Sequence, residues 1–151
     1  VNVLLGFGLY PSLLFAALVS VIGNTLIDRL GHEMVWAGRE YIPRRTPLTH
    51  TILRSVLWGL ISTLPLIVLI YYLYSYRYFL SDTALITTDG ILVGPSHMLL
   101  DVFTERGIYV KKDGKWRRFA LAHYRYDDPI ANGLAGFIGV LMLIAALVLF
   151  R

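Results

Sequence analysis

Two pairs of aspartate and histidine lie four residues apart in apolar stretches of this sequence. Asp28 and His32 form the first pair, and His97 and Asp101 form the second. On a helix this spacing places both side chains on one face, where they can reach a common ion. Imidazole and carboxylate together suit zinc, manganese or iron better than calcium or magnesium. The pairs predict a divalent metal site, with zinc expected first and manganese or iron as alternatives.

A third histidine, His50, lies in the segment RRTPLTH. Thr46 has the type expected of an N-cap and Pro47 that of a first helical position, so His50 would fall in the first helical turn. The free N–H groups of such a turn favour an anion, and Arg44 and Arg45 directly precede them. A metal there would acidify a water molecule, while the arginines neutralise the charge that develops.

The predicted site combines three overlapping sets of residues. The expected metal ligands are Asp28, His32, His50, His97 and Asp101. The expected catalytic residues are His50, Asp101 and Arg45, and the expected binders of the substrate anion are Arg44, Arg45 and Arg106. The remaining polar residues have structural explanations: His123 as a surface histidine, Asp127 and Asp128 as helix caps, and Asp89 in a structural hydrogen bond.

Composition and hydrophobic runs indicate an all-α membrane protein. The chain is 56% hydrophobic and 16% charged, whereas soluble domains carry about 25% charged residues. About 20 apolar residues cross a bilayer, which predicts a four-helix transmembrane bundle in one integral domain, 1–151. The expected spans are about 3–27, 55–76, 84–103 and 130–150, with Pro11 marking a kink or the true start of the first. Gly94 and Pro95 are expected to interrupt the third span, and Gly133, Gly136 and Gly139 to allow close helix packing in the fourth.

The basic residues predict the topology. Residues 28–54 and 104–129 contain every Lys and Arg except Arg77 and Arg151. With four spans these two segments share one side, which the positive-inside tendency makes cytoplasmic. Both termini would then lie outside the cell membrane, and all five expected ligands would share the cytoplasmic face. Within the second segment, residues 107–121 read as a β-hairpin with Asp113-Gly114 in the turn.

Two motifs resemble a known family. RRTPLTHT, followed by SHMLLDVFTERG, resembles the membrane-bound metal-dependent hydrolases, also described as LexA-binding, inner-membrane-associated hydrolases, and is closest to a small uncharacterised archaeal membrane family. The resemblance implies metal-dependent hydrolysis, with Thr49-His50 matching its Thr-His pair and His97 and Asp101 its His-Asp pair. Asp28 matches an early acidic residue. The chain departs from the family pattern because His32 follows four residues later and Arg45 replaces an additional His.

Several functions fit these residues. The leading hypothesis is a membrane-embedded hydrolase acting on a phosphoester or a lipid-linked anionic substrate at the cytoplasmic face. The alternative is a non-catalytic structural or assembly protein of a secretion, conjugation or virion apparatus, in which the polar cluster fixes helix register. A transporter is a third option. The expected partners are the lipid bilayer, a phosphorylated or lipid substrate and, as a further option, other copies of the chain in a homo-oligomer. Nucleic acid is not expected, because no recognition motif is present.

Overall fold

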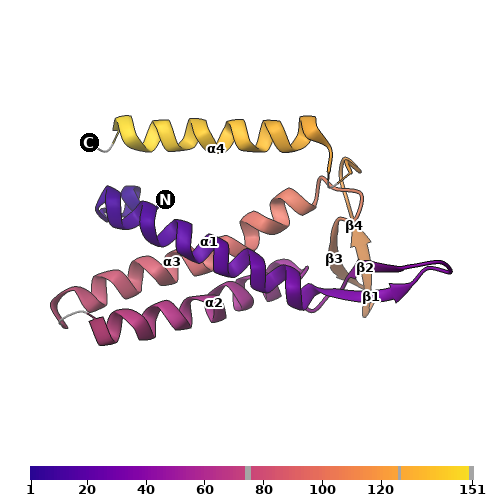
Figure 1. The fold of residues 1–151 in the computed structure, drawn as a ribbon, viewed down its shortest axis with the longest axis horizontal. Coiled ribbons are helices and arrows are strands. Elements are labelled where there is room, and N and C mark those ends of the chain that lie inside the picture. The colour runs from indigo at the N-terminus through magenta and orange to yellow at the C-terminus, as the bar shows by residue number, and fades with distance from the viewer. Residues whose placement is uncertain (74–75, 126, 150–151) are drawn as a thin grey trace.

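The computed structural model describes residues 1–73, 76–125 and 127–149, and it is mostly helical (Figure 1). Arg151 and the side chain of Arg77 lie outside the described residues. In chain order the elements are the 3-10 helix η1 (Asn2–Leu5), α1 (Leu9–Gly31), β1 (His32–Trp36), β2 (Tyr41–Arg45), α2 (Ile52–Leu73), α3 (Tyr76–Asp101), β3 (Ile108–Lys112), β4 (Lys115–Phe119) and α4 (Pro129–Leu149).

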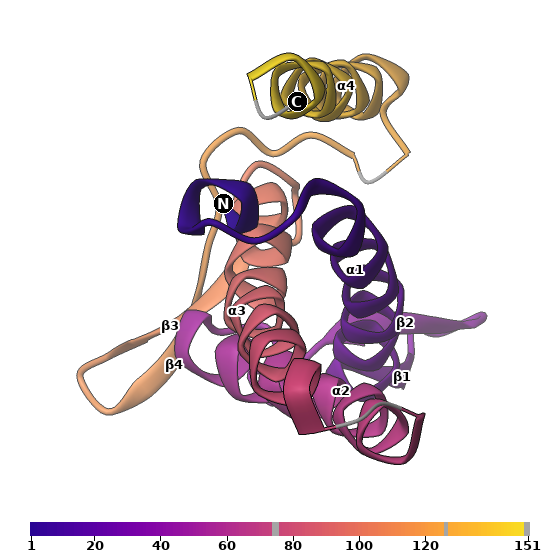
Figure 2. The same ribbon diagram turned by 90° about the vertical axis from the view of Figure 1, so that its left-hand side faces the viewer.

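Helices α1, α2 and α3 pack into a three-helix bundle, and α4 runs beside it (Figure 2). The bundle core is formed by apolar side chains of all three helices: Phe15, Val19, Leu66, Ile70, Leu85, Ile86 and Val93. None of the described residues of α4 is buried. Both hairpins lie at one end of the bundle, where α1 and α3 end and α2 and α4 begin (Figure 1).

Three of the helices, α1, α2 and α4, are long and apolar enough to cross a membrane. The chain is therefore a multi-pass membrane protein whose apolar helices lie in a lipid bilayer. Helix α3 is less apolar, because Asp82, Asp89 and Asp101 lie within it.

The helix boundaries differ from the expected spans at two functionally important points. Helix α1 begins at Leu9, so Pro11 does mark its first turn, and it continues to Gly31. Helix α2 begins at Ile52, so the expected helix start at Thr46 and Pro47 is wrong. Thr51 takes the capping position, because its hydroxyl accepts from the Arg54 backbone N–H at 3.3 Å.

The expected interruption of the third span at Gly94 and Pro95 is also wrong, since α3 runs through both residues. Gly94 lets α2 approach closely: a Cβ there would lie 2.1 Å from the Ser55 carbonyl oxygen. Packing of this kind keeps a helix intact across a proline when neighbouring helices shield the backbone.

The glycines that carry close packing are not those expected. A Cβ added to Gly133, Gly136 or Gly139 of α4 would have no atom of the described chain within 4 Å, whereas Gly59 and Gly90 bring α2 and α3 together. A Cβ on Gly59 would lie 2.1 Å from the Gly90 carbonyl oxygen. Close packing of α2 against α3 therefore depends on Gly59 and Gly90.

The two hairpins differ in how well the sequence predicts them. Strands β3 and β4 form the expected hairpin, with Asp113 and Gly114 at positive φ in its turn. Strands β1 and β2 form a second antiparallel hairpin, in a segment where only a polar loop was expected. Its register pairs His32 with Arg45 and so returns Arg45 to the end of α1.

Candidate metal centre

The five expected metal ligands come together at the hairpin end of the bundle. Asp28 lies in the last turn of α1, and His32 is the first residue of β1. His50 lies in the turn before α2, and His97 and Asp101 lie at the end of α3. Three segments distant in sequence, 28–32, the turn at 50 and 97–101, therefore place their polar side chains at one point.

Two of these histidines each lie close to the same two aspartates. The Nε2 atom of His97 lies 3.5 Å from Asp28 Oδ1 and 3.4 Å from Asp101 Oδ2. The Nε2 atom of His50 lies 3.9 Å from Asp28 Oδ1 and 3.7 Å from Asp101 Oδ2. Zinc bonds of about 2.0–2.2 Å in a tetrahedron separate neighbouring ligand atoms by roughly 3.4 Å. The spacing fits a single divalent cation held by Asp28, His50 and His97, whose ligand atoms all lie within 4.8 Å of one another, with Asp101 Oδ2 beside both histidines.

Hydrogen bonds at the opposite ring nitrogens fix the tautomer of both histidines. The Asn24 amide nitrogen donates to Ser20 Oγ, so Asn24 Oδ1 accepts from His97 Nδ1–H at 3.0 Å. The Thr49 hydroxyl donates to the Ile27 carbonyl, so its oxygen accepts from His50 Nδ1–H at 2.9 Å. His50 Nε2 then carries a lone pair directed at the carboxylates, and His97 Nε2 faces the same two carboxylates. Metal-binding histidines are oriented by partners of this kind.

Three of the converging atoms have no hydrogen-bond partner among the described residues. The Nε2 atoms of His50 and His97 and the Oδ2 atom of Asp101 are buried without a hydrogen bond. Burial lowers the pKa of His50 to about 4, which the Asp101 carboxylate only partly offsets. The His50 ring is therefore neutral at pH 7, the form that binds metal.

Close packing against the end of α1 holds His50 in place. Its side chain is fully buried, and a Cβ on Gly31 would lie 2.4 Å from the His50 ring and 2.0 Å from Thr49 Oγ1. The His50 carbonyl accepts from the Tyr109 backbone N–H of β3 at 2.8 Å. The second hairpin thus supports the turn that carries His50.

Arg45 lies behind Asp101 and is engaged in a buried network. Its guanidinium donates to Asp101 Oδ1 at 2.6 Å, to Thr104 Oγ1 at 3.0 Å and to the Gly107 carbonyl at 3.1 Å. Asp101 is thereby held with its second oxygen facing the two histidines. These bonds suit a positioning role for Arg45, whereas its expected contact with a substrate anion stays a prediction.

A cavity of about 740 Å³ opens beside Asp28, His97 and Asp101, with His50 buried outside its lining, and we call it the metal cavity. Its polar end is formed by Asp28, His32, Arg45, His97, Asp101, Thr104, Arg106 and Arg125. Its other side is formed by α4 side chains that are mainly apolar, including Leu134 and Ile138. The cavity therefore joins a cluster of ionisable groups to a surface suited to hydrocarbon.

The other expected site residues occupy distinct places. The His32 ring packs edge-on against His50, with centroids 5.0 Å apart, and its Nδ1–H donates to the Asp28 carbonyl at 2.7 Å. His32 lies beside the four ligands, so its role as a fifth ligand stays a prediction. Arg106 lines the metal cavity, whereas Arg44 is exposed on β2 and faces Glu33 at 3.9 Å.

Four polar residues were expected to have structural or surface roles, and the structure agrees for all of them except Asp127. Asp128 caps α4 by accepting from the backbone N–H groups of Ile130 and Ala131, both at 2.9 Å. Asp127 instead pairs with Arg125, so its expected capping role is wrong. His123 is exposed, as expected. Asp89 has the expected hydrogen bond, which it accepts from the Asn2 amide at 2.6 Å.

Sequence reasoning missed Asn24, which orients His97 from the preceding turn of α1. Asn24 lies four residues before Asp28, so the two side chains share a helix face. An amide in an otherwise uncharged apolar run was the available signal. Thr104 belongs to the motif SHMLLDVFTERG, but its hydrogen bond to Arg45 depends on the turn after α3, which the sequence does not predict.

Together, the apolar helices and the ligand cluster define a multi-pass membrane protein with a candidate metal centre at one end of its helices. A family model described as a protein of unknown function (DUF1286) matches residues 1–100, so the chain belongs to the DUF1286 family. This match is to a different family from the one that the two motifs resemble. The assignment to the membrane-bound metal-dependent hydrolases, and to a small archaeal membrane family, is therefore wrong. No curated protein and no solved structure matches the chain.

Proposed function

We propose that this protein binds one divalent cation, zinc in the first instance, through Asp28, His50, His97 and Asp101. The observation that carries the proposal is the convergence of three buried, unpaired atoms, His50 Nε2, His97 Nε2 and Asp101 Oδ2, with the half-exposed Asp28 Oδ1, at His–Asp separations of 3.4–3.9 Å. Two bare imidazole nitrogens facing carboxylate oxygens repel one another unless a cation or a proton lies between them. A cation satisfies all four ligands at once.

We infer that the site hydrolyses a phosphoester. A bound divalent cation acidifies water and neutralises charge on a phosphoryl group. The water oxygen would bond to phosphorus while the bond from phosphorus to the leaving oxygen breaks, and a proton of the water would pass to that oxygen. His32 lies beside Asp28 in the metal cavity and is the residue we assign to carry this proton. Arg106 would contact the phosphoryl oxygens, and Arg45 would position Asp101.

The shape of the metal cavity favours a lipid-linked substrate. Its ionisable end would hold the phosphate group, and its α4 wall, with Leu134 and Ile138, would contact hydrocarbon. Since no described residue of α4 is buried and the helix lies beside the bundle, a lipid would reach the cavity from the bilayer without crossing the polar hairpins.

We further propose that α3 is a fourth span. With 26 residues at about 1.5 Å each, it is roughly 39 Å long, more than the hydrocarbon core of about 30 Å. Its apolar side chains Leu85, Ile86 and Val93 pack into the bundle core. Both basic segments and the metal cavity would then lie at the cytoplasmic face of the cell membrane, with both termini outside.

A phosphate-release assay tests the proposed activity. Zinc-loaded protein in mixed micelles with dioctanoyl phosphatidate should release inorganic phosphate, and a chelator should abolish this. Asp28→Asn should lower the rate by more than about 100-fold, because losing even an outer-shell partner of a metal costs 10–100-fold. His123 is exposed and has a φ of 58°, which asparagine adopts readily, so His123→Asn should retain activity. Release that is unaffected by chelation, or no release by zinc-loaded wild type, would contradict the proposal.

One observation favours a second candidate, an assembly protein without catalysis. A Cβ added to any of three glycines of α4 would have no atom of the described chain within 4 Å: Gly133, Gly136 and Gly139. Small residues on an uncovered helix face allow a partner helix to approach closely. In that case the protein should purify as a stoichiometric assembly. His50→Ala should then lower stability without changing any measured hydrolysis.

A further inference from the structure

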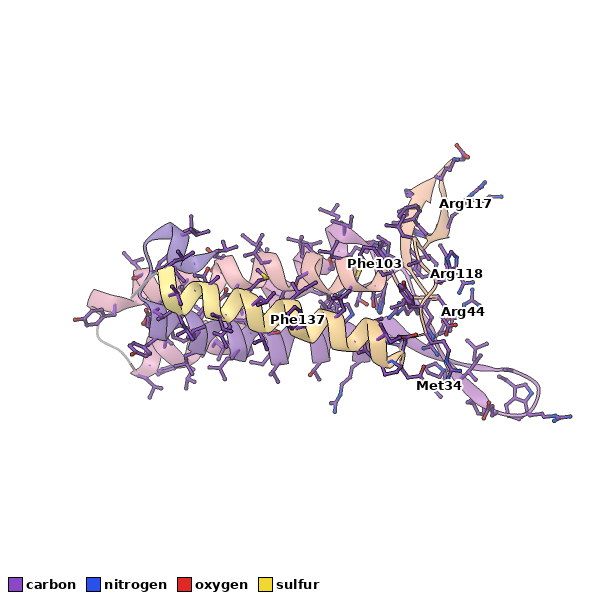
Figure 3. The ribbon with its side chains drawn as sticks, turned by 90° about the horizontal axis from the view of Figure 1, so that it is seen from above. Met34, Arg44, Phe103, Arg117, Arg118 and Phe137 are labelled. Carbon is purple, nitrogen blue, oxygen red and sulfur yellow. The ribbon has the colours of Figure 1, made fainter. Side chains whose placement is uncertain are left out.

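A second cavity of about 560 Å³ lies between the two hairpins, and we call it the hairpin groove. It is lined by Val35, Ile42, Pro43, Arg44, Arg45, Arg106, Tyr109, Trp116 and Arg118. Four of these residues are arginines, and no carboxylate is among them. Figure 3 shows Arg44 and Arg118 near one another where the hairpins approach, with Arg117 further along toward the tip of the second hairpin.

Asp101 balances the charge of Arg45, so the excess positive charge of the groove comes from Arg44 and Arg118. Arg44 is 3.9 Å from Glu33, and both side chains are more than half exposed, so this pair is weak. Within the described residues, Arg118 has no ion pair or side-chain hydrogen bond. Just outside the groove, Arg54 lies over the Trp116 ring at 4.9 Å from its centroid and adds a further positive charge.

Contacts between the hairpins hold the groove in shape. The Tyr109 hydroxyl donates to the Arg45 carbonyl at 2.9 Å, and the Arg45 guanidinium donates to the Gly107 carbonyl at 3.1 Å. The first hairpin is thereby bonded to the second through both the backbone and the side chain of Arg45. A site formed before its ligand arrives loses less conformational entropy on binding.

The groove and the metal cavity share two walls, since Arg45 and Arg106 line both. The groove and the metal cavity differ in their remaining lining residues. Helix α4 supplies an apolar wall to the metal cavity, whereas the hairpins supply arginines and aromatic side chains to the groove. The groove therefore lies on the far side of these arginines from α4.

We propose that the hairpin groove is a second site, which binds a phosphate-bearing anion. Arginine guanidinium groups match phosphate oxygens in paired, charge-assisted hydrogen bonds, and lysine does not provide this geometry. A cavity of this volume accommodates two linked phosphates with room beside them. The anion is either a soluble phosphate compound or the headgroup of an anionic lipid. The proposal does not depend on hydrolysis at the metal centre.

Calorimetry with inorganic pyrophosphate tests the soluble source. Protein in nanodiscs of neutral phosphatidylcholine should bind pyrophosphate, and Arg118→Gln and Arg44→Gln should each weaken binding about tenfold, as expected for one charge-assisted contact. Arg117→Gln is the matched control, because Arg117 is the neighbouring arginine but pairs with Asp113 and does not line the groove. It should change the affinity less than about twofold.

A lipid arm distinguishes the other source. If phosphatidylglycerol in the nanodisc binds the protein in native mass spectrometry, and Arg118→Gln removes it while Arg117→Gln does not, the headgroup is the ligand. His97→Ala should leave binding in either arm unchanged, so a failed metal site would not affect the result. Equal weakening by all three arginine variants, loss of binding in His97→Ala, or no binding of either ligand would overturn the proposal.

Discussion

Two aspartates of the same helix, Asp101 and Asp89, have very different surroundings. The Asp101 carboxylate contacts the Arg45 guanidinium at 2.6 Å, and imidazole nitrogens lie 3.4 and 3.7 Å from its other oxygen. The Asp89 carboxylate, near the middle of α3, accepts a hydrogen bond from a neutral amide, that of Asn2. Asn2 is itself buried.

This difference teaches how to separate a structural acid from a candidate ligand. Burial alone does not do so, because each aspartate has one buried oxygen without a hydrogen bond. What distinguishes Asp101 is that its unpaired oxygen faces two other unpaired ligand atoms from different elements. Convergence of unsatisfied atoms, rather than an unusual acid in an apolar helix, indicates an ion site.

The sharpest test of the comparison replaces each acid by its amide. Asp101→Asn leaves the Arg45 charge buried without its counter-charge, so the free energy of unfolding should fall by about 3–5 kcal/mol. Asp89→Asn still accepts from Asn2 and should cost about 1 kcal/mol or less. Unfolding in mixed detergent micelles measures both, and equal losses would remove the distinction between the two aspartates.

A smaller effect is expected where backbone packing supports the metal end. Gly31→Ala places a methyl group against Thr49 and His50, which should destabilise the protein by about 1–3 kcal/mol and displace His50. Gly133→Ala adds the same group where no described atom lies within 4 Å and is the matched control. Retention of full metal binding by Gly31→Ala would show that His50 does not need this packing.

Asn24 tests whether the tautomer of His97 matters. Removing its amide oxygen in Asn24→Ala frees the His97 ring to rotate, and zinc affinity should fall about 10–100-fold. Competition with a chromophoric chelator measures the change. Ser20→Ala removes the acceptor of the Asn24 amide nitrogen but leaves the Asn24 oxygen in place, so zinc affinity should fall much less, and matching losses would argue against orientation of the ring by Asn24.

The smallest effect is expected at the start of α4. Asp128→Ala removes the acceptor for two backbone N–H groups, which should cost about 1 kcal/mol of stability. Its metal content should equal that of wild type, because the cap is not part of the ligand cluster. Asp127→Ala, which removes an exposed pair with Arg125, should cost less. Thermal unfolding in detergent ranks the two variants, and a larger loss for Asp127→Ala would contradict the assignment of the cap.

The sequence predicted the helices and the meeting of the ligands better than it predicted local detail. Long apolar runs and the distribution of arginines were enough to bring Asp28, His50 and His97 to one end. The helix start at Thr46-Pro47 was predicted wrongly because capping propensity was outweighed by tertiary contacts of Thr49 with the end of α1.

Two other features could not be predicted because they depend on neighbouring elements. The path of α3 through Pro95 depends on its close packing against α2. The hairpin of β1 and β2 has no tight two-residue turn signal, and most of its side chains are exposed, so alternation of apolar residues is weak. That hairpin brings Arg45 to Asp101, a contact that the position of Arg45 in the sequence does not predict.

Metal analysis of the purified protein is the most direct test of the central claim. Wild type prepared without chelator and analysed by inductively coupled plasma mass spectrometry should contain about one zinc, or another divalent transition metal, per chain. His97→Ala and Asp101→Asn should lose it, while His123→Asn and Asp89→Asn should keep it. Wild type that contains no metal and binds none on titration, or ligand variants that retain full occupancy, would contradict the account.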